Sequence, residues 1–314
     1  MLKVGLVGAR GHTGRELVAI LSRRSDMALV FASSRAMAGE PVKKLAPEAP
    51  EGLLFEALGP QDVAMRGADA VILALPNGEA APYVAAIEAA APQTIIVDLS
   101  ADYRFDDAWT YGLPELYGRE RLKGATRISN PGCYATSGQL CVYPVRDLLV
   151  GPAHLFGVSG YSGAGTTPSR KNDLAALRDN LMPYSLTGHL HEREMSRHLG
   201  HEVRFSPHVA AFFRGITLTA QLSFAAPVTL EALQERYESA YGSETLIRLS
   251  DAIPEIRDGQ DIPGAVVGGW SIAEDGRHAV VVCALDNLLK GAAVQAAQNL
   301  ALAAGLDELA GIVN

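Results

Sequence analysis

Four short segments in the first hundred residues carry almost only apolar side chains, and they constrain the fold more than any other feature. They are residues 2–7, 28–32, 70–75 and 95–99. An alanine-rich helix is expected over residues 80–91, between the last two. Strands without polar alternation are buried on both faces, as in a parallel sheet covered by helices. We therefore expect an α/β domain with a doubly wound parallel sheet.

The second half of the chain has a different pattern. In residues 216–224 apolar and polar side chains alternate strictly, which predicts a half-solvated strand of an antiparallel sheet. Residues 266–272 and 278–285 are two further strand candidates, and residues 230–237 predict a helix before them. We expect an α+β domain with a mostly antiparallel sheet to follow the α/β domain.

The length of the chain, 314 residues, suits two domains better than a single core. Residues 288–304 predict a long C-terminal helix, rich in alanine. We expect one domain to comprise residues 1–132 and 286–314, and the other residues 133–285.

Charge and cysteine content indicate where such a chain works. The net charge is −8 and Lys and Arg form no block, so a nucleic-acid partner is not expected. Three cysteines in a chain of this length do not form a disulfide framework. No apolar run reaches the roughly 20 residues that span a bilayer. We expect a soluble, cytoplasmic protein with no membrane contact and no metal site.

A glycine-rich turn separates the first strand from the first helix. Its glycines follow the spacing GxxGxxG, and together they let the backbone approach a pyrophosphate at the helix N-terminus. The alternative is an ordinary tight turn, because glycines alone are weak evidence. The predicted dinucleotide contacts of this Rossmann-type turn are Gly8, Arg10, Gly11, His12, Thr13 and Gly14.

The end of the second strand indicates which dinucleotide binds. An NAD site places Asp or Glu there, on the ribose hydroxyls. Here the chain has Ser33, Ser34 and Arg35. Ser34 and Arg35 can hold a 2′-phosphate, so NADP is favoured. The alternative for Arg35 is a solvated loop charge.

The stretch from Ser129 to Thr136, SNPGCYAT, contains the candidate nucleophile. Pro131 and Gly132 form a turn, and an amphipathic segment follows, so Cys133 falls in a first helical turn. There the helix dipole and unpaired N–H groups stabilise a thiolate. Cys141 and Cys283 lie in apolar surroundings and are expected in the core.

At these residues the sequence resembles a known family, the N-acetyl-γ-glutamyl-phosphate reductases of the aspartate-semialdehyde-dehydrogenase-like group. The resemblance runs nearly end to end, with NPGCYAT as its most specific motif. It departs from the family pattern at Arg10, His12, Leu190 and Arg193. Further matching segments are SSR at 33–35, DLSADYRF at 98–105, SGYSGAG at 159–165, FRGI at 213–216 and DNLLKGAA at 286–293.

The resemblance implies an NADP-dependent reductase that forms a thioester on Cys133, releases inorganic phosphate and yields an aldehyde. His191 is the expected acid/base, because the pKa of histidine lies near working pH. His189 and Glu194 are the expected orienting or substrate-contacting partners. His189 can instead be a structural donor.

The substrate and cofactor also need further contacts under this resemblance. Arginine binds carboxylate and phosphate through paired hydrogen bonds. We assign the leaving phosphate to Arg104 and the substrate carboxylate to Arg214. The alternative for either arginine is a surface ion pair without a functional role. The nicotinamide contacts are expected at Ser162, Gly163 and Asn287.

Two rival interpretations stay open from the sequence. One is aspartate-semialdehyde dehydrogenase, but its signatures have Asn, not Gly, before the cysteine and a histidine where this chain has Ile216. The other is a non-catalytic NADP-binding redox sensor. The acyl group of the substrate can be acetyl, succinyl or a carrier-protein amide. A homo-oligomer, dimer or tetramer, is expected to form through the half-polar sheet.

Overall fold

The computed structural model describes residues 1–313, which form two compact units. Unit 1 contains residues 1–131 and the chain from residue 292 onward, and unit 2 contains residues 132–291. The segment 286–291, which we assigned to the first domain from the sequence, therefore belongs to unit 2. Within residues 1–313 no helix is both long and apolar enough to cross a membrane.

Unit 1 is built on a parallel sheet of seven strands in the order β3-β2-β1-β4-β5-β7-β6. The four predicted strands are confirmed, and the order reverses between β1 and β4, as in a doubly wound sheet. The strands are β1 (Leu2–Val7), β2 (Met27–Ser33), β3 (Phe55–Glu56), β4 (Ala70–Leu73), β5 (Ile95–Asp98), β6 (Thr110–Tyr111) and β7 (Arg127–Ser129).

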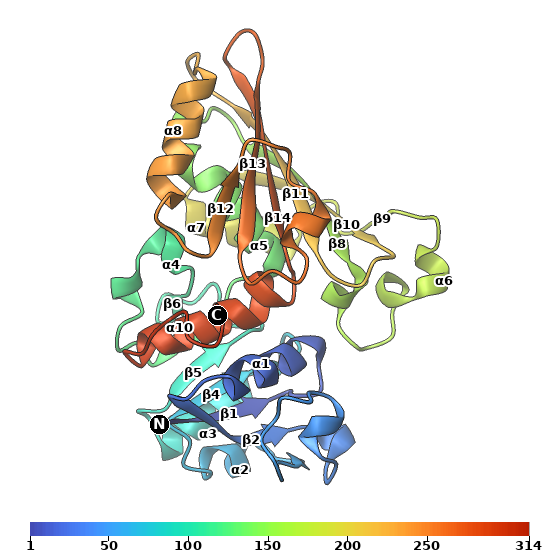
Figure 1. Cartoon of the computed structure of the whole chain (residues 1–314), viewed down its shortest axis with the longest axis vertical. Helices are drawn as coiled ribbons and strands as arrows, with labels where there is room; N and C mark the ends of the chain where they lie inside the picture. The colour runs from blue at the N-terminus through green and yellow to red at the C-terminus, as the bar shows by residue number, and fades with distance from the viewer. Residues whose placement is uncertain (314) are drawn as a thin grey trace. The chain divides into compact units, whose positions relative to one another are not determined.

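Helices cover both faces of this sheet. Figure 1 shows α1 and α10 on one face, and α2 and α3 on the other. The helices of unit 1 are α1 (His12–Ser22), α2 (Pro60–Ala64), α3 (Ala81–Ala90), α4 (Pro114–Tyr117) and α10 (Val294–Ala303).

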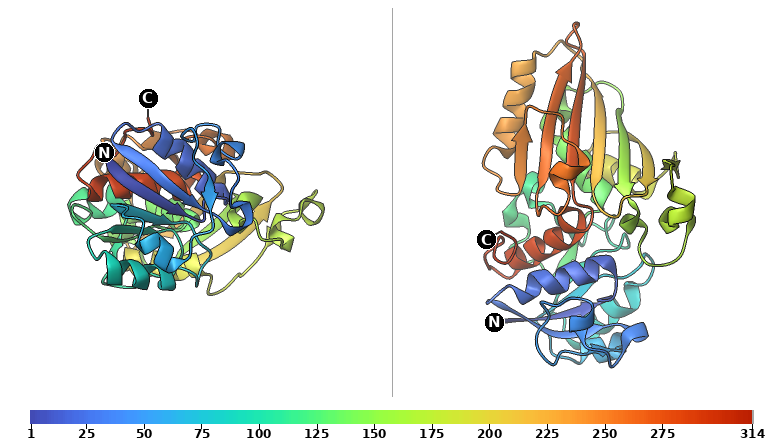
Figure 2. Two further views of the ribbon diagram at one scale, coloured as in Figure 1. Left: turned by 90° about the horizontal axis from the view of Figure 1, so that it is seen from below. Right: turned by 45° about the vertical axis from the view of Figure 1, so that its right-hand side comes forward.

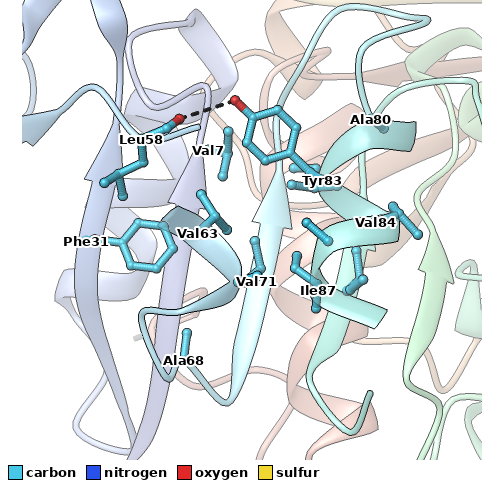
Figure 3. Packing of buried hydrophobic residues seen from close by; sticks show 14 of the residues in the cluster. Val7, Phe31, Leu58, Val63, Ala68, Val71, Ala80, Tyr83, Val84 and Ile87 are labelled. Atoms are coloured by element: carbon cyan, nitrogen blue, oxygen red, sulfur yellow. Dashed lines mark hydrogen bonds between the residues drawn. The ribbon is translucent and has the colours of Figure 1, made fainter. Parts of the chain in front are cut away.

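The core beneath α2 and α3 holds the parallel sheet in place. Val71 of β4 lies between Val63 of α2 and Ile87 of α3, and all three are almost fully buried (Figure 3). The hydroxyl of Tyr83 donates to the carbonyl of Leu58 at 3.3 Å, so the one polar atom of that ring is satisfied. Burial on this face, together with burial beneath α1 and α10 on the other, explains why these strands show no polar alternation.

Unit 2 contains a second seven-stranded sheet, in the order β12-β13-β14-β11-β8-β10-β9. Most neighbouring pairs are antiparallel, but β10 pairs in parallel with β8, and β12 with β13. The expected mostly antiparallel sheet is confirmed. Its strands are β8 (Ala153–Gly160), β9 (Met182–Pro183), β10 (Val203–Ala210), β11 (Ile216–Ser223), β12 (Ile247–Ser250), β13 (Ala265–Ile272) and β14 (His278–Leu285).

One face of this sheet is packed and the other is open. The predicted alternation in β11 is confirmed, since Ile216, Leu218 and Ala220 are fully buried and the residues between them are partly exposed. Helix α5 packs on β11 and β14, and α7 packs on α5 and β10. Figure 2 shows the sheet and α8 from a second side. The helices are α5 (Cys133–Val142), α6 (Leu174–Leu177), α7 (Leu190–Leu199), α8 (Leu230–Tyr241) and α9 (Ile256–Gly259).

The predicted helix over residues 288–304 begins differently from our expectation. Leu289–Ala293 is a π-helical turn, and α10 starts only at Val294. The N–H of Gly291 donates to the carbonyl of Asp286, five residues earlier, at 2.9 Å. The carboxylate of Asp286 accepts the N–H groups of Leu288 and Leu289 and so starts the turn. Wide turns of this kind are frequent at functional sites.

Candidate active site

Cys133 is the first residue of α5, as predicted. Gly132 precedes it with an extended backbone (φ −74°, ψ 150°), so the helix begins at the cysteine. Its side chain is half-buried, whereas Cys141 and Cys283 are fully buried, as predicted. The dipole at a helix N-terminus favours a thiolate over a thiol. Of the three cysteines, Cys133 therefore has the helix position and the exposure that a nucleophile needs.

The π-helical turn lies directly against the nucleophile. A Cβ atom added at Gly291 would lie 2.7 Å from Cys133 Cβ and 3.2 Å from Cys133 Cα. Real Cβ atoms do not approach that closely, so a side chain at position 291 would displace Cys133. The sequence showed Gly291 as part of a matching segment but gave it no role. The close approach brings the Asp286 turn to the reactive cysteine.

Glu194 reaches the same place from α7. It is fully buried, and its Oε1 accepts the N–H of Gly132 at 2.9 Å. Helix α7 packs closely on α5 at Gly138, where an added Cβ would lie 2.2 Å from the sulfur of Met195. The sequence predicted an orienting or substrate-contacting Glu194. Its observed contact is with the backbone that carries Cys133.

His189 caps helix α7. Its Nδ1 accepts the N–H of His191 at 3.1 Å, so this nitrogen carries no proton. Burial, and next the positive charge of Lys171, lowers the pKa of His189 below its ordinary value. His189 is thus held as a neutral imidazole. This favours the structural alternative that the sequence left open for it.

His191 lies in an aromatic cluster next to the nucleophile. Its ring centroid lies 5.0 Å from that of His189 and 5.9 Å from that of Tyr134, the residue after Cys133. Tyr184 joins the cluster at 5.5 Å from His189. Burial, and then the nearby charge of Cys133, raises the pKa of Tyr184. The two predicted histidines therefore share one ring cluster with Tyr134, the residue after Cys133, and with Tyr184, to which no sequence pattern pointed.

Arg214 has carboxylate partners from this chain. Its Nε lies 2.6 Å from Asp286 Oδ2, and its Nη1 lies 3.0 Å from Asp261 Oδ1. Asp286 is fully buried, so this ion pair is largely shielded from water. We predicted from the sequence that Arg214 binds the substrate carboxylate. In the structure its positive charge is compensated by Asp286 and Asp261.

The predicted nicotinamide contacts of unit 2 lie together. The amide of Asn287 donates to Ser162 Oγ at 2.9 Å, and its Oδ1 accepts the N–H of Gly215 at 2.8 Å. Ser162 and Asn287 are buried, whereas Gly163 beside them is exposed. The polar atoms of Asn287 hold β11 to the glycine-rich turn, which leaves the Gly163 backbone open to a ligand.

The glycine turn of unit 1 has the geometry that the sequence predicts. Gly8 has φ +84°, and an added Cβ would lie 2.1 Å from the carbonyl oxygen of Ala74. An added Cβ at Gly14 would lie 2.6 Å from the carbonyl oxygen of Ala9. Gly11 precedes α1 and has no side chain to cap the helix. The N-terminus of α1, with Arg10, His12 and Thr13 around it, can therefore accept an anion.

The end of β2 lacks an acidic residue of its own, as expected. Ser33 and Ser34 are buried and Arg35 is exposed. The N–H of Ser34 donates to the carbonyl of Glu56 at 2.8 Å, and the carboxylate of Glu56 forms an ion pair with Arg66. The single acid on the neighbouring strand is thus neutralised. The ion pair with Arg66 reduces the repulsion that Glu56 would exert on a 2′-phosphate.

Arg104 is buried between the ends of two strands of unit 1. Its Nε donates to the carbonyl of Asn130 at 2.8 Å, and its Nη2 to the carbonyl of Leu99 at 2.8 Å. Nearby, burial raises the pKa of Asp98 to about 6, against hydrogen bonds from Ser100 that lower it. Arg104 therefore joins the segment after β5 to the segment that leads to Cys133.

Comparisons with known proteins place the chain in a family. Residues 3–125 match the model "Semialdehyde dehydrogenase, NAD binding domain", and residues 133–287 match "Semialdehyde dehydrogenase, dimerisation domain". The probable aspartate-semialdehyde dehydrogenase of Pseudomonas aeruginosa superposes with a TM-score of 0.77 at 20% identity, covering 96% of this chain and 98% of that one. At that identity the likeness shows the fold.

Relatives with much higher sequence identity to this chain share one name. The N-acetyl-gamma-glutamyl-phosphate reductase of Stenotrophomonas maltophilia is 57% identical over 309 residues, covering 98% of this chain and 97% of that protein. The enzyme of the same name from Xanthomonas oryzae is 55% identical, with 98% of each chain covered. The chain belongs to the N-acetyl-gamma-glutamyl-phosphate reductases, within the semialdehyde dehydrogenase family.

Proposed function

We propose that this protein reduces N-acetyl-γ-glutamyl phosphate to N-acetylglutamate 5-semialdehyde and phosphate with NADPH, a step of arginine biosynthesis. The observation that carries the proposal is the position of Cys133, half-buried at the start of α5 and backed by Gly291 and by Glu194. Relatives more than 50% identical over nearly the whole chain bear the name of this reductase.

The first step uses Cys133 as the nucleophile. Its thiolate attacks the γ-acyl carbon, phosphate leaves with the electron pair of the carbon–oxygen bond, and a thioester on Cys133 remains. The negative charge that develops on the carbonyl oxygen is stabilised by N–H groups in the first turn of α5. Glu194 supports this step indirectly, because its bond to Gly132 N fixes where the helix begins.

The second step needs a hydride and a proton. NADPH, when bound, supplies the hydride that converts the thioester into an aldehyde. We assign to His191 the exchange of protons at the sulfur and the carbonyl oxygen. Its ring lies 5.9 Å from the ring of Tyr134, the residue after Cys133. His189 is assigned to orientation, because its Nδ1 is occupied by the N–H of His191.

The glycine turn of unit 1 fits a dinucleotide. Side chains at Gly8 or Gly14 would collide with the chain itself, so the turn is shaped for close approach of its backbone. We assign the pyrophosphate to residues 8–14 and the 2′-phosphate to Ser33, Ser34 and Arg35. Gly163, with Ser162 and Asn287, is assigned to the nicotinamide end. Arg104, whose guanidinium is held by bonds to the carbonyls of Asn130 and Leu99, is assigned to the leaving phosphate.

We infer further that unit 1 binds the cofactor and that unit 2 carries the chemistry and self-association. The match of residues 133–287 to a dimerisation domain supports a homo-oligomer, dimer or tetramer. The open face of the unit 2 sheet suits this role, because Phe156 on β8 is 41% exposed and its ring centroid lies 4.4 Å from that of His208 on β10. A cytoplasmic location stays a prediction.

The test is an assay in the reverse direction. The purified protein is supplied with NADP, phosphate and one of three aldehydes: N-acetylglutamate semialdehyde, its N-succinyl analogue or aspartate semialdehyde. We expect phosphate-dependent formation of NADPH with the N-acetyl compound at the highest kcat/KM. Highest efficiency with aspartate semialdehyde would overturn the substrate assignment. Binding of NADP without turnover of any aldehyde would favour the redox-sensor alternative.

A further inference from the structure

We propose that Lys171, which no sequence pattern singled out, binds the α-carboxylate of the substrate in unit 2. The inference deepens the proposed function and rests on it. An N-acylated glutamyl phosphate carries two anionic groups, and its amino group is neutralised by the acyl group. A cation must therefore recognise the carboxylate at the end of the substrate away from the reacting carbon.

The residue first assigned to this carboxylate is not available as an uncompensated cation. Arg214 forms ion pairs with Asp286 and with Asp261, at 2.6 and 3.0 Å. Asp286 also accepts the N–H groups of Asp261, Leu288 and Leu289, so it cannot leave Arg214 without stranding several donors. A substrate carboxylate at Arg214 would face two fixed negative charges.

Lys171 lies against the aromatic cluster of Tyr184, His189 and His191. Its ammonium is 4.7 Å from the centre of the Tyr184 ring, which in turn lies 5.5 Å from the ring of His189. The side chain is half-buried, and within residues 1–313 no carboxylate forms an ion pair with it. A half-buried ammonium held over a ring has lost part of its hydration, which strengthens its attraction for an arriving anion.

The turn that carries Lys171 is held in place by a neighbouring side chain. Asn172 accepts the N–H of Ser169 at 2.8 Å and donates to the carbonyls of Gly165 and Thr167. This fixes the short 3-10 turn Arg170–Asn172. Lys171 is the residue of the turn that faces the cluster, whereas Arg170 is exposed. The positions of the two cations provide a matched pair for experiment.

The distance of each anionic group from the reacting carbon favours the carboxylate, and not the phosphate, as the group that Lys171 binds. The phosphate is bonded to the carbon that Cys133 attacks, so it must lie next to that sulfur. Two methylene groups and the α-carbon separate the carboxylate from the same carbon. Lys171 lies over the ring of Tyr184, and that ring lies 5.5 Å from the ring of His189, in the cluster that also contains Tyr134, the residue after Cys133. That is where the far end of the substrate belongs.

The test compares Lys171→Met with Arg170→Met in the aldehyde, phosphate and NADP assay. We expect Lys171→Met to raise KM for N-acetylglutamate semialdehyde roughly ten- to hundredfold, the worth of a hydrogen bond to a charged group, with KM for phosphate unchanged. Arg170→Met should leave both values unchanged, and Lys171→Arg should restore most of the affinity.

A second substrate separates recognition from folding. 4-Acetamidobutanal is the same aldehyde without the carboxylate, so Lys171→Met should leave its kcat/KM at the wild-type value. An equal loss with both aldehydes, an increase in KM for phosphate, or an unchanged KM for N-acetylglutamate semialdehyde would each overturn the role of Lys171. If the wild type itself does not turn over N-acetylglutamate semialdehyde, the proposed function fails, and this inference fails with it.

Discussion

The glycine turn of unit 1 and the cysteine cluster of unit 2 are built in opposite ways. The turn comes from one continuous stretch, residues 8–14, in which a side chain at Gly8 or Gly14 would collide with backbone. The cluster draws on four separated stretches, around Cys133, Tyr184, His191 and Gly291. A local backbone motif tolerates change in its surroundings, whereas an assembled cluster depends on every element that packs it. The two regions should therefore respond differently to mutation.

Cys133→Ser should have the largest effect. The weaker nucleophile cannot form the thioester, so kcat should fall by at least about 10³-fold. Binding of NADPH, measured by fluorescence titration, should stay unchanged, because the glycine turn lies in unit 1. Cys141→Ala is the matched control, since that thiol is fully buried, and it should keep kcat. Activity of Cys133→Ser within tenfold of wild type would exclude covalent catalysis.

His191→Asn should come next, with kcat reduced by roughly 10²–10⁴-fold, the range for loss of a positioned acid/base. One limb of the pH–rate profile should flatten. His189→Asn should instead raise KM and keep both limbs, because a residue that orients the substrate contributes uniform binding. If the limb flattens in His189→Asn and not in His191→Asn, the two roles are reversed.

Gly291→Ala should reduce kcat by about 10²-fold, since displacement of a reacting group by about 1 Å has that cost. The added methyl group would lie 2.7 Å from Cys133 Cβ and must push the nucleophile aside. Gly59→Ala is the control, because Gly59 has φ −83° and its nearest neighbour is the flexible carboxylate of Asp62 at 3.4 Å. Steady-state kinetics with wild-type values for Gly291→Ala would show that the close contact has no catalytic consequence.

Ser34→Asp should change cofactor choice and little else. A carboxylate at the end of β2 repels a 2′-phosphate and can accept ribose hydroxyls, so preference should shift from NADPH toward NADH. We expect KM for NADPH to rise about tenfold or more, the effect of about 1.4 kcal/mol, while kcat stays within a few-fold. Equal kcat/KM for both cofactors in the wild type would contradict the assignment of Ser34 and Arg35.

The smallest expected effect is that of His189 on how the free energy of unfolding depends on pH. Its pKa is lowered in the folded state, so the unfolded chain binds a proton more readily. The contribution of His189 to the free energy of unfolding is therefore present above its unfolded pKa, about 6.5, and is lost as pH falls through the lower folded value. Urea denaturation at pH 8 and pH 5 should show less loss of stability for His189→Asn than for wild type. An identical loss would mean that the imidazole is not held neutral.

The sequence by itself determined the parts whose physics is local. Continuous apolar segments predicted β1, β2, β4 and β5, because strands that are buried on both faces carry apolar side chains throughout. Strict alternation predicted β11, because a strand that is buried on one face has apolar side chains on that face alone. The glycine turn and the start of α5 at Cys133 followed from residues adjacent in the chain. The family resemblance added the histidine pair.

Only the tertiary structure decided which side chains meet. Arg214 looked like an anion site from its type, but folding brings it to Asp286 and Asp261. The role of Gly291 depends on a turn more than 150 residues away from Cys133 in the chain. Lys171 has no local pattern, and it acquires a role only because β9 and α7 bring Tyr184 and His189 beside it. Charge compensation and close approach each depend on two residues that are distant in the chain. The sequence specifies such pairs only through the fold that brings the two residues together.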